Sequence, residues 1–90
     1  MEKTKYHFKL CEQSLWFFND VLRQLINEFK IDEDEALGRL NKRFGGGDYS
    51  KDFEYLFHDT PKDWAYFIYY GKNSQWWNKS KDELKPLPYP

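Results

Sequence analysis

Polar and apolar residues follow a helical period from about Cys11 to Phe29. When this stretch is drawn at about 100° per residue, its apolar side chains fall within one half of the wheel. Those side chains are Cys11, Leu15, Phe18, Val21, Leu22, Leu25, Ile26 and Phe29. The pattern predicts an amphipathic helix of about five turns whose apolar half faces a core.

A second helix is predicted to begin at Asp32, after the short Lys30-Ile31 connection. Asp32 and Glu35 have the spacing of a capping box, and an acidic first turn suits the positive end of a helix. The run Gly45-Gly46-Gly47 ends the helix, because glycine readily adopts left-handed conformations. The apolar stripe between these signals consists of Ala36, Leu37, Leu40 and Phe44. The short connection makes the first two helices neighbours, packed either as an antiparallel hairpin or as a more perpendicular corner.

The third helix is predicted from its own start and stop signals. Thr60 is a suitable N-cap, Pro61 suits the first helical position, Asp63 completes an acidic first turn and Gly71 ends the run. Helical spacing places Trp64, Phe67 and Ile68 on one face and Tyr66, Tyr69 and Tyr70 on the other.

Two shorter segments are less regular. Residues 48–59 are expected to form a loop with a short strand or a helical turn, and residues 4–10 alternate like an edge strand that could pair with residues 53–57. The predicted fold is therefore mainly α, with three helices, an aromatic core and a short hairpin or pair of edge strands. We expect one domain over residues 1–80 and an extended proline-rich tail over residues 81–90.

Composition narrows the setting of this domain. The chain has 90 residues, enough for one core, and aromatic residues make up 21% of it, so the core is expected to be built of rings. The 14 basic and 15 acidic residues are mixed along the chain, which disfavours nucleic acid and excludes a charge-driven membrane contact. A single cysteine and the absence of an apolar leader or span point to a reducing, cytoplasmic location.

Several short stretches resemble a group of small uncharacterised bacterial proteins. They are the run from Glu35 to Asn41, the run Leu56 to Asp59, the pair Trp64-Ala65, the run Ile68 to Gly71 and the pair Trp76-Trp77. The resemblance covers roughly residues 11–77. It implies a bacterial, cytoplasmic, stand-alone domain and carries no activity with it.

Catalytic and metal-binding patterns are weak. His7 and Cys11 have i, i+4 spacing, but zinc needs three or four ligands and the usual paired motifs are missing, so we expect a buried structural thiol and no metal or other cofactor. His58 precedes Asp59 and a helix cap, a context more typical of a turn than of a catalytic base. An enzyme that uses His58 is therefore the weakest of three functional hypotheses.

The second hypothesis is a nucleic-acid-binding protein. Arg39, Lys42 and Arg43 are predicted to lie on the polar side of the second helix, in a possible helix-turn-helix. The acidic start of that helix and the lack of a basic surplus argue against it, because phosphate contacts supply most nonspecific affinity.

The leading hypothesis is a non-catalytic protein-binding domain, such as an inhibitor, an immunity protein or an adaptor, acting as a monomer or homodimer on an unidentified protein partner. Trp16 projects into the polar arc of the first helix, where it is either covered by the C-terminal segment or serves as a binding anchor. The candidate surface comprises Trp16, Arg23, Tyr66, Tyr69, Tyr70, Trp76 and Trp77.

Overall fold

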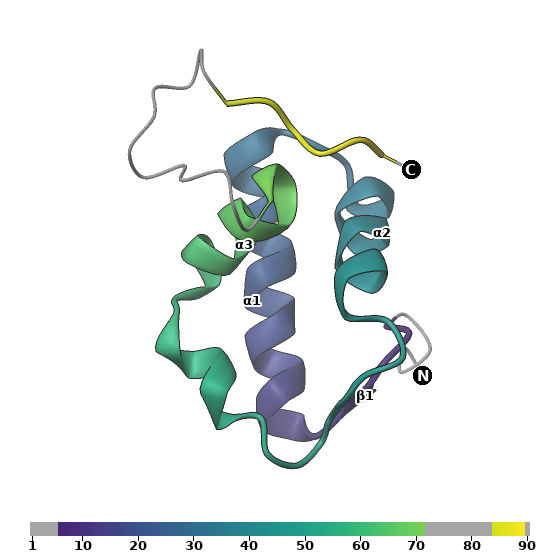
Figure 1. Ribbon diagram of the computed structural model, residues 1–90, viewed down its shortest axis with the longest axis vertical. Coiled ribbons are helices and arrows are strands. Elements are labelled where there is room, and N and C mark those ends of the chain that lie inside the picture. The colour runs from purple at the N-terminus through teal and green to yellow at the C-terminus, as the bar shows by residue number, and fades with distance from the viewer. Residues whose placement is uncertain (1–5, 72–83, 90) are drawn as a thin grey trace.

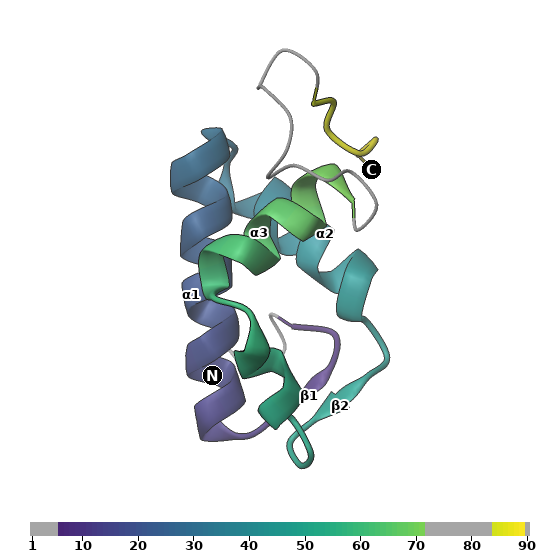
Figure 2. The ribbon, with the colours of Figure 1, turned by 60° about the vertical axis from the view of Figure 1, so that its left-hand side comes forward.

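Residues 6–71 fold into three α-helices around an aromatic core, as expected from the sequence. A computed structural model describes residues 6–71 and 84–89. The long helix α1 (Glu12–Phe29) is flanked by α2 (Glu33–Phe44) and crossed by α3 (Pro61–Tyr70), as Figure 1 shows. Figure 2, turned from this view, shows α2 and α3 on the same side of α1. The predicted boundary at residue 80 lies outside the described residues.

The helix ends confirm the local signals. The Asp32 carboxylate accepts a hydrogen bond from the Glu35 backbone N–H at 2.8 Å, and the Thr60 hydroxyl accepts one from the Asp63 N–H at 3.1 Å. Pro61 occupies the first helical position of α3. The glycine run ends α2 through Gly46, which has a φ of 83°. The three helices therefore begin and end within a residue or two of the predicted positions.

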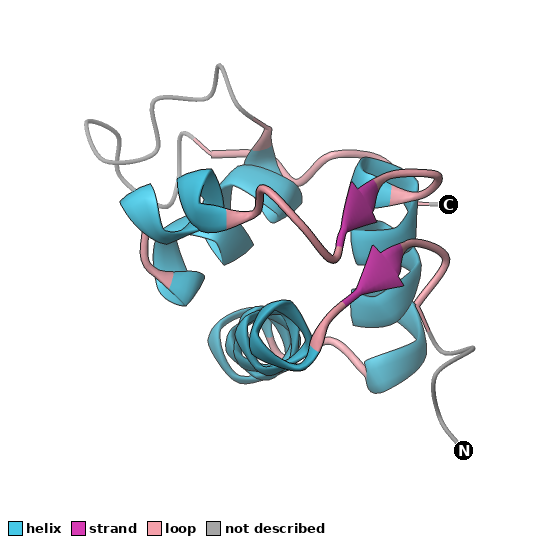
Figure 3. Ribbon diagram, turned by 90° about the horizontal axis from the view of Figure 1, so that it is seen from below, coloured by secondary structure: helices cyan, strands magenta, loops and turns pink. Residues whose placement is uncertain are grey.

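The expected strand pairing was wrong. Strand β1 (Lys9–Leu10) pairs in parallel with β2 (Asp48–Tyr49), with Lys9 opposite Asp48, whereas residues 53–57 were the expected partner. The two strands lie side by side in Figure 3. The reason is the glycine turn after α2, which brings the chain beside β1: the Gly46 N–H donates to the His7 carbonyl at 2.9 Å and the Lys9 N–H donates to the Gly47 carbonyl at 3.1 Å.

The segment that was expected to pair forms a 3₁₀ helix, η2 (Glu54–His58). Phe53 and Leu56 are buried, whereas Tyr55 and Phe57 are exposed. This spacing of three is the period of a 3₁₀ helix, in which residues i and i+3 lie on the same side. The Leu56 carbonyl also accepts a hydrogen bond from the Trp64 indole at 2.7 Å, which ties η2 to α3.

The core is built of rings, as the composition predicts. Phe18 is 1% exposed, and its ring centre lies 4.9 Å from those of Phe8 and Phe44 and 5.5 Å from that of Tyr49. Edge-to-face pairs at such distances contribute about 0.5–1.5 kcal/mol beyond the area they bury. Phe18 belongs to α1, Phe44 to α2 and Tyr49 to β2, and Phe8 directly precedes β1. The aromatic cluster therefore joins the first two helices to the strand pair.

Candidate protein-binding surface

The structure separates the predicted surface residues into two groups. Trp16 and Arg23 lie on the outer face of α1, whereas the three tyrosines of α3 pack at the C-terminal end of α1. Trp76 and Trp77 lie outside the described residues.

Trp16 is exposed. Its exposed fraction is 62%, the largest among the large hydrophobic side chains of residues 6–71 and 84–89. At about 100° per residue it points opposite to the buried stripe centred on Val21 and Leu25. Residues 84–89 do not cover it, because they lie across α2 and α3 (Figure 1).

Polar side chains surround Trp16 and are held in place by neighbours. The Arg23 guanidinium lies 2.6 Å from the Asp20 carboxylate, and both side chains are exposed. Asn19 accepts a hydrogen bond from the Tyr6 hydroxyl at 2.6 Å. Together Trp16, Asn19, Asp20 and Arg23 line a shallow hollow of about 340 Å³. An indole thus borders a hollow that also presents a guanidinium, a carboxylate and an amide.

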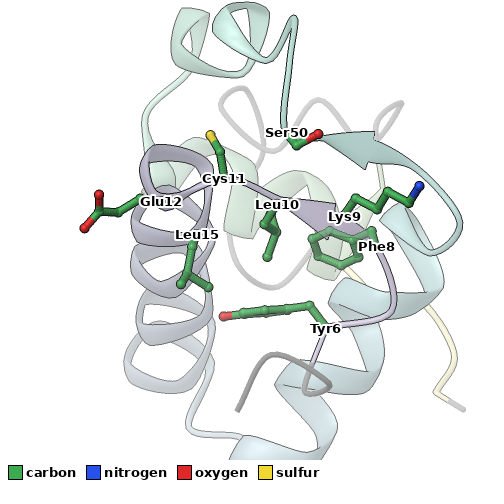
Figure 4. A pocket seen from close by; sticks show the side chains of 8 residues that line it. All are labelled: Tyr6, Phe8, Lys9, Leu10, Cys11, Glu12, Leu15 and Ser50. Carbon is green, nitrogen blue, oxygen red and sulfur yellow. The ribbon is translucent and has the colours of Figure 1, made fainter. Parts of the chain in front are cut away.

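A larger hollow lies beside the first turns of α1. It measures about 820 Å³, and Figure 4 shows the Leu10 and Leu15 side chains facing one another above the Tyr6 ring. The side chains of Lys9 and Glu12 point outward from it. Glu12, which lines this hollow, lies one helical turn before Trp16, so the hollow borders the face of α1 that carries the indole. This hollow was not predicted from the sequence, although the alternation of Tyr6, Phe8 and Leu10 indicates that these side chains share one side of the chain.

A third hollow lies toward the C-terminal half of α1. It measures about 300 Å³ and is lined by Asn19, Leu22, Arg23, Ile26 and Glu33. Asn19 and Arg23 also border the hollow beside Trp16, so the two are continuous. We call the band formed by these three hollows and Trp16 the α1 strip.

Tyr6 connects the core to this strip. Its ring is buried against Phe8 and Phe18, while its hydroxyl reaches Asn19. Burial, followed by the negative charge of Glu33, raises the pKa of Tyr6 to about 12. The hydroxyl is therefore protonated at neutral pH and donates its hydrogen bond to Asn19.

Cys11 is the N-cap of α1 and is partly exposed, whereas a buried thiol was expected. Its sulfur lies 3.5 Å from the Ser14 hydroxyl, and its backbone N–H donates to that hydroxyl at 2.9 Å. These contacts, led by the hydrogen bond from the Ser14 hydroxyl, lower the pKa of the Cys11 thiol. The thiol lies at the start of α1 and borders the hollow of about 820 Å³.

The tyrosines of α3 form a packed cluster. Tyr69 stacks on Phe29 with ring centres 3.9 Å apart and planes 10° apart, and Tyr70 meets the same ring edge-on at 5.4 Å. The Tyr66 hydroxyl donates to the Glu28 carboxylate at 2.9 Å, and burial with this contact raises the pKa of Tyr66 to about 12. These rings hold α3 against α1 while remaining partly exposed.

The basic residues of α2 do not form one exposed face. Lys42 and Arg43 are exposed, but Arg39 is only 7% exposed and pairs with Glu35 at 2.8 Å. Arg39 is therefore not available to phosphates, and the predicted nucleic-acid surface is reduced to two cations.

Catalytic and metal chemistry find little support in the geometry. His58 is exposed at the end of η2. Within residues 6–71 and 84–89, histidine, cysteine and carboxylate side chains form no group of three or more that could hold a metal ion. Of the helices in these ranges, none combines the length and apolar character needed to cross a bilayer.

Comparisons with family models, with curated proteins and with solved structures find no match to this chain.

Proposed function

We propose that this protein is a small non-catalytic binding domain that recognises a protein partner through the α1 strip. The observation that carries the proposal is the exposure of Trp16 on the face of α1 opposite the core. Burying an indole removes a large apolar area from water. Tryptophan and arginine are also enriched among the residues that dominate interface affinity. Trp16 and Arg23 line the same hollow on α1, so one surface presents both of these residue types.

The chemistry of the strip indicates what kind of partner it fits. The hollow beside β1 is lined mainly by apolar and aromatic side chains, with Lys9, Glu12 and Ser50 also among its lining residues. The hollows around Trp16 present charges of both signs. A partner would insert an apolar side chain beside Leu10 and Leu15 and place polar groups opposite Asp20 and Arg23. A protein surface meets both needs, whereas nucleic acid would bring phosphates against Glu12, Asp20 and Glu33.

The biological role follows from this mode of action. A non-catalytic domain that binds proteins through such a face acts by covering or connecting them, as an inhibitor, an immunity protein or an adaptor does. We propose a bacterial, cytoplasmic setting, supported by the resemblance described above and by the single cysteine of the sequence.

A quantitative pull-down from native lysate tests the proposal. Tagged wild-type protein is compared with Trp16→Ala, and Tyr55→Ala is the matched control because Tyr55 is an exposed ring on η2. Loss of an interface hot spot costs about 2 kcal/mol or more, so Trp16→Ala should recover at least about tenfold less partner. Equal recovery by wild type and Trp16→Ala would show that the α1 strip is not the binding surface.

A further inference from the structure

The C-terminal segment, residues 84–89, lies in an extended conformation across one end of α2 and α3 (Figure 1). It is held through its backbone at Leu87. The Leu87 N–H donates to the Tyr69 carbonyl at 2.8 Å, and the Leu87 carbonyl accepts from the Arg39 guanidinium at 3.1 Å. Both the N–H and the carbonyl of Leu87 are thus hydrogen-bonded to residues of α2 and α3.

Arg39 acts as the clamp of this contact. Its Nε–H donates a hydrogen bond to the Glu35 carboxylate at 2.9 Å, and a terminal nitrogen forms an ion pair with the same oxygen at 2.8 Å. The central guanidinium carbon lies 4.6 Å from the Tyr69 ring centre and 5.4 Å from that of Tyr89. The side chain is 7% exposed. A planar guanidinium can stack and donate in the plane at the same time, which an ammonium group cannot do.

Two glycines shape the seats for the side chains. A Cβ built at Gly38 would lie 1.9 Å from the Tyr89 hydroxyl oxygen and 2.6 Å from the adjacent ring carbon, so the tyrosine seat exists because position 38 has no side chain. A Cβ at Gly71 would meet the Leu87 side chain at 3.3 Å. Gly38 lies inside α2, where glycine is less favourable than alanine by about 0.5–1 kcal/mol. The helix therefore carries a destabilising residue at the point where Tyr89 sits.

We propose that the surface formed by Gly38 and Arg39 of α2, Tyr69 of α3 and Gly71, called here the tail groove, is a second recognition site, which binds an extended Leu-Pro-Tyr segment of a partner protein in competition with the chain's own tail. Proline-rich segments suit such a groove because they are extended before binding and their backbone groups are free to hydrogen-bond. The tail is then an intramolecular occupant that limits access. This site is separate from the α1 strip and does not depend on it.

Competition sets the expected size of the effect. Residues 72–83 connect α3 to the tail, and a short connection of this kind holds a tethered ligand at an effective concentration of the order of mM. For a segment with an intrinsic dissociation constant of about 100 μM, that concentration weakens binding of an external peptide about tenfold.

The test uses a fluorescent peptide with the sequence of residues 84–90 and measures its binding to the full-length chain by anisotropy. The tail-weakened variant Leu87→Ala/Tyr89→Ala should bind the peptide about tenfold more tightly than wild type does. Adding Gly38→Ala should abolish this gain, because the new methyl group occupies the tyrosine seat while improving the intrinsic helix propensity of α2. A scrambled peptide of the same composition is the control.

Three results would overturn the proposal. They are the lack of saturable binding to the tail-weakened variant, binding that Gly38→Ala leaves unchanged, and a wild-type dimer that becomes monomeric on Tyr89→Ala. The last would make the tail of a second copy the natural occupant. Thermal unfolding followed by circular dichroism checks that each variant folds. If the tail-weakened double variant does not fold, Tyr89→Ala alone takes its place. Arg39→Lys then replaces Gly38→Ala as the substitution expected to prevent peptide binding.

Discussion

Individual rings in this protein have different roles according to their position on α1. Trp16 points away from the core and is 62% exposed, whereas Phe18, two residues later, is 1% exposed. About 200° of rotation separates two such positions on a helix. An aromatic residue in this sequence is therefore assigned to the core or to the surface by its place on the helical wheel.

Substitution of each ring separates the two roles. Phe18→Ala should lower the free energy of unfolding by about 3–5 kcal/mol, because it leaves a cavity among the packed rings of the core. Trp16→Ala should change it by less than about 0.5 kcal/mol, since the indole is largely in water. Urea denaturation followed by circular dichroism measures both. A loss above 2 kcal/mol for Trp16→Ala would mean that the indole is part of the core.

Tyr6 makes stability depend on pH in the alkaline range. Its pKa is raised from 10.0 to about 12 by burial and Glu33, so above pH 10 the unfolded chain loses the Tyr6 proton while the folded chain keeps it. Because the folded state then binds more protons, the free energy of unfolding falls as pH rises from about 10 to about 12. Each tenfold difference in acidity corresponds to about 1.4 kcal/mol.

The measurement is the urea midpoint of wild type and Tyr6→Phe between pH 8 and pH 12. Tyr6→Phe should be less stable near pH 8, where the hydrogen bond to Asn19 is lost, and should show a shallower decline above pH 10. Parallel curves for the two proteins would contradict the assignment to Tyr6.

At the scale of elements, the helix ends depend on side chains that act over three residues. Asp32→Ala and Thr60→Ala each remove the acceptor that satisfies an otherwise unpaired backbone N–H, and each should lower the free energy of unfolding by about 1 kcal/mol. The two caps belong to different helices, so their effects should add in the double variant. Glu33→Ala, an exposed change in the same first turn of α2, is the control for loss of a carboxylate alone. A double variant as stable as wild type would show that the caps contribute nothing.

Locality explains which elements the sequence could predict. The signals around Asp32, Thr60 and Gly71 act within one helical turn, and the corresponding helix ends are where they were expected. The partner of β1 was not predictable in this way, because it depends on the glycine turn that follows α2. Residues 48–59 contain a short strand and a helical turn, as expected, but the alternating rings of residues 53–57 wrongly suggested that this part would pair with β1.

In the whole molecule, the candidate sites likewise combine features that local sequence predicts with features that depend on contacts between distant segments. The wheel of α1 was enough to place Trp16 and Arg23 outward. Burial of Arg39 was not predictable, because it requires Tyr69 of α3 and Tyr89 of the tail to converge on α2. The hollow between β1 and α1 likewise needs two segments brought together by the fold. The outward face of α1 could therefore be predicted from the sequence, whereas sites formed by contacts between elements could not.

Whether Trp16 meets a protein partner can be tested by photo-crosslinking from a neighbouring position that leaves the indole in place. A benzophenone amino acid replaces the exposed Asp20, which borders the same hollow as Trp16, in one version of the protein and the exposed Tyr55 in another, and both are irradiated in native lysate. We expect a discrete adduct from position 20 that is absent from position 55, is suppressed by excess wild-type protein and persists in excess Trp16→Ala. The same adducts from both positions, or none from position 20, would contradict a partner at Trp16.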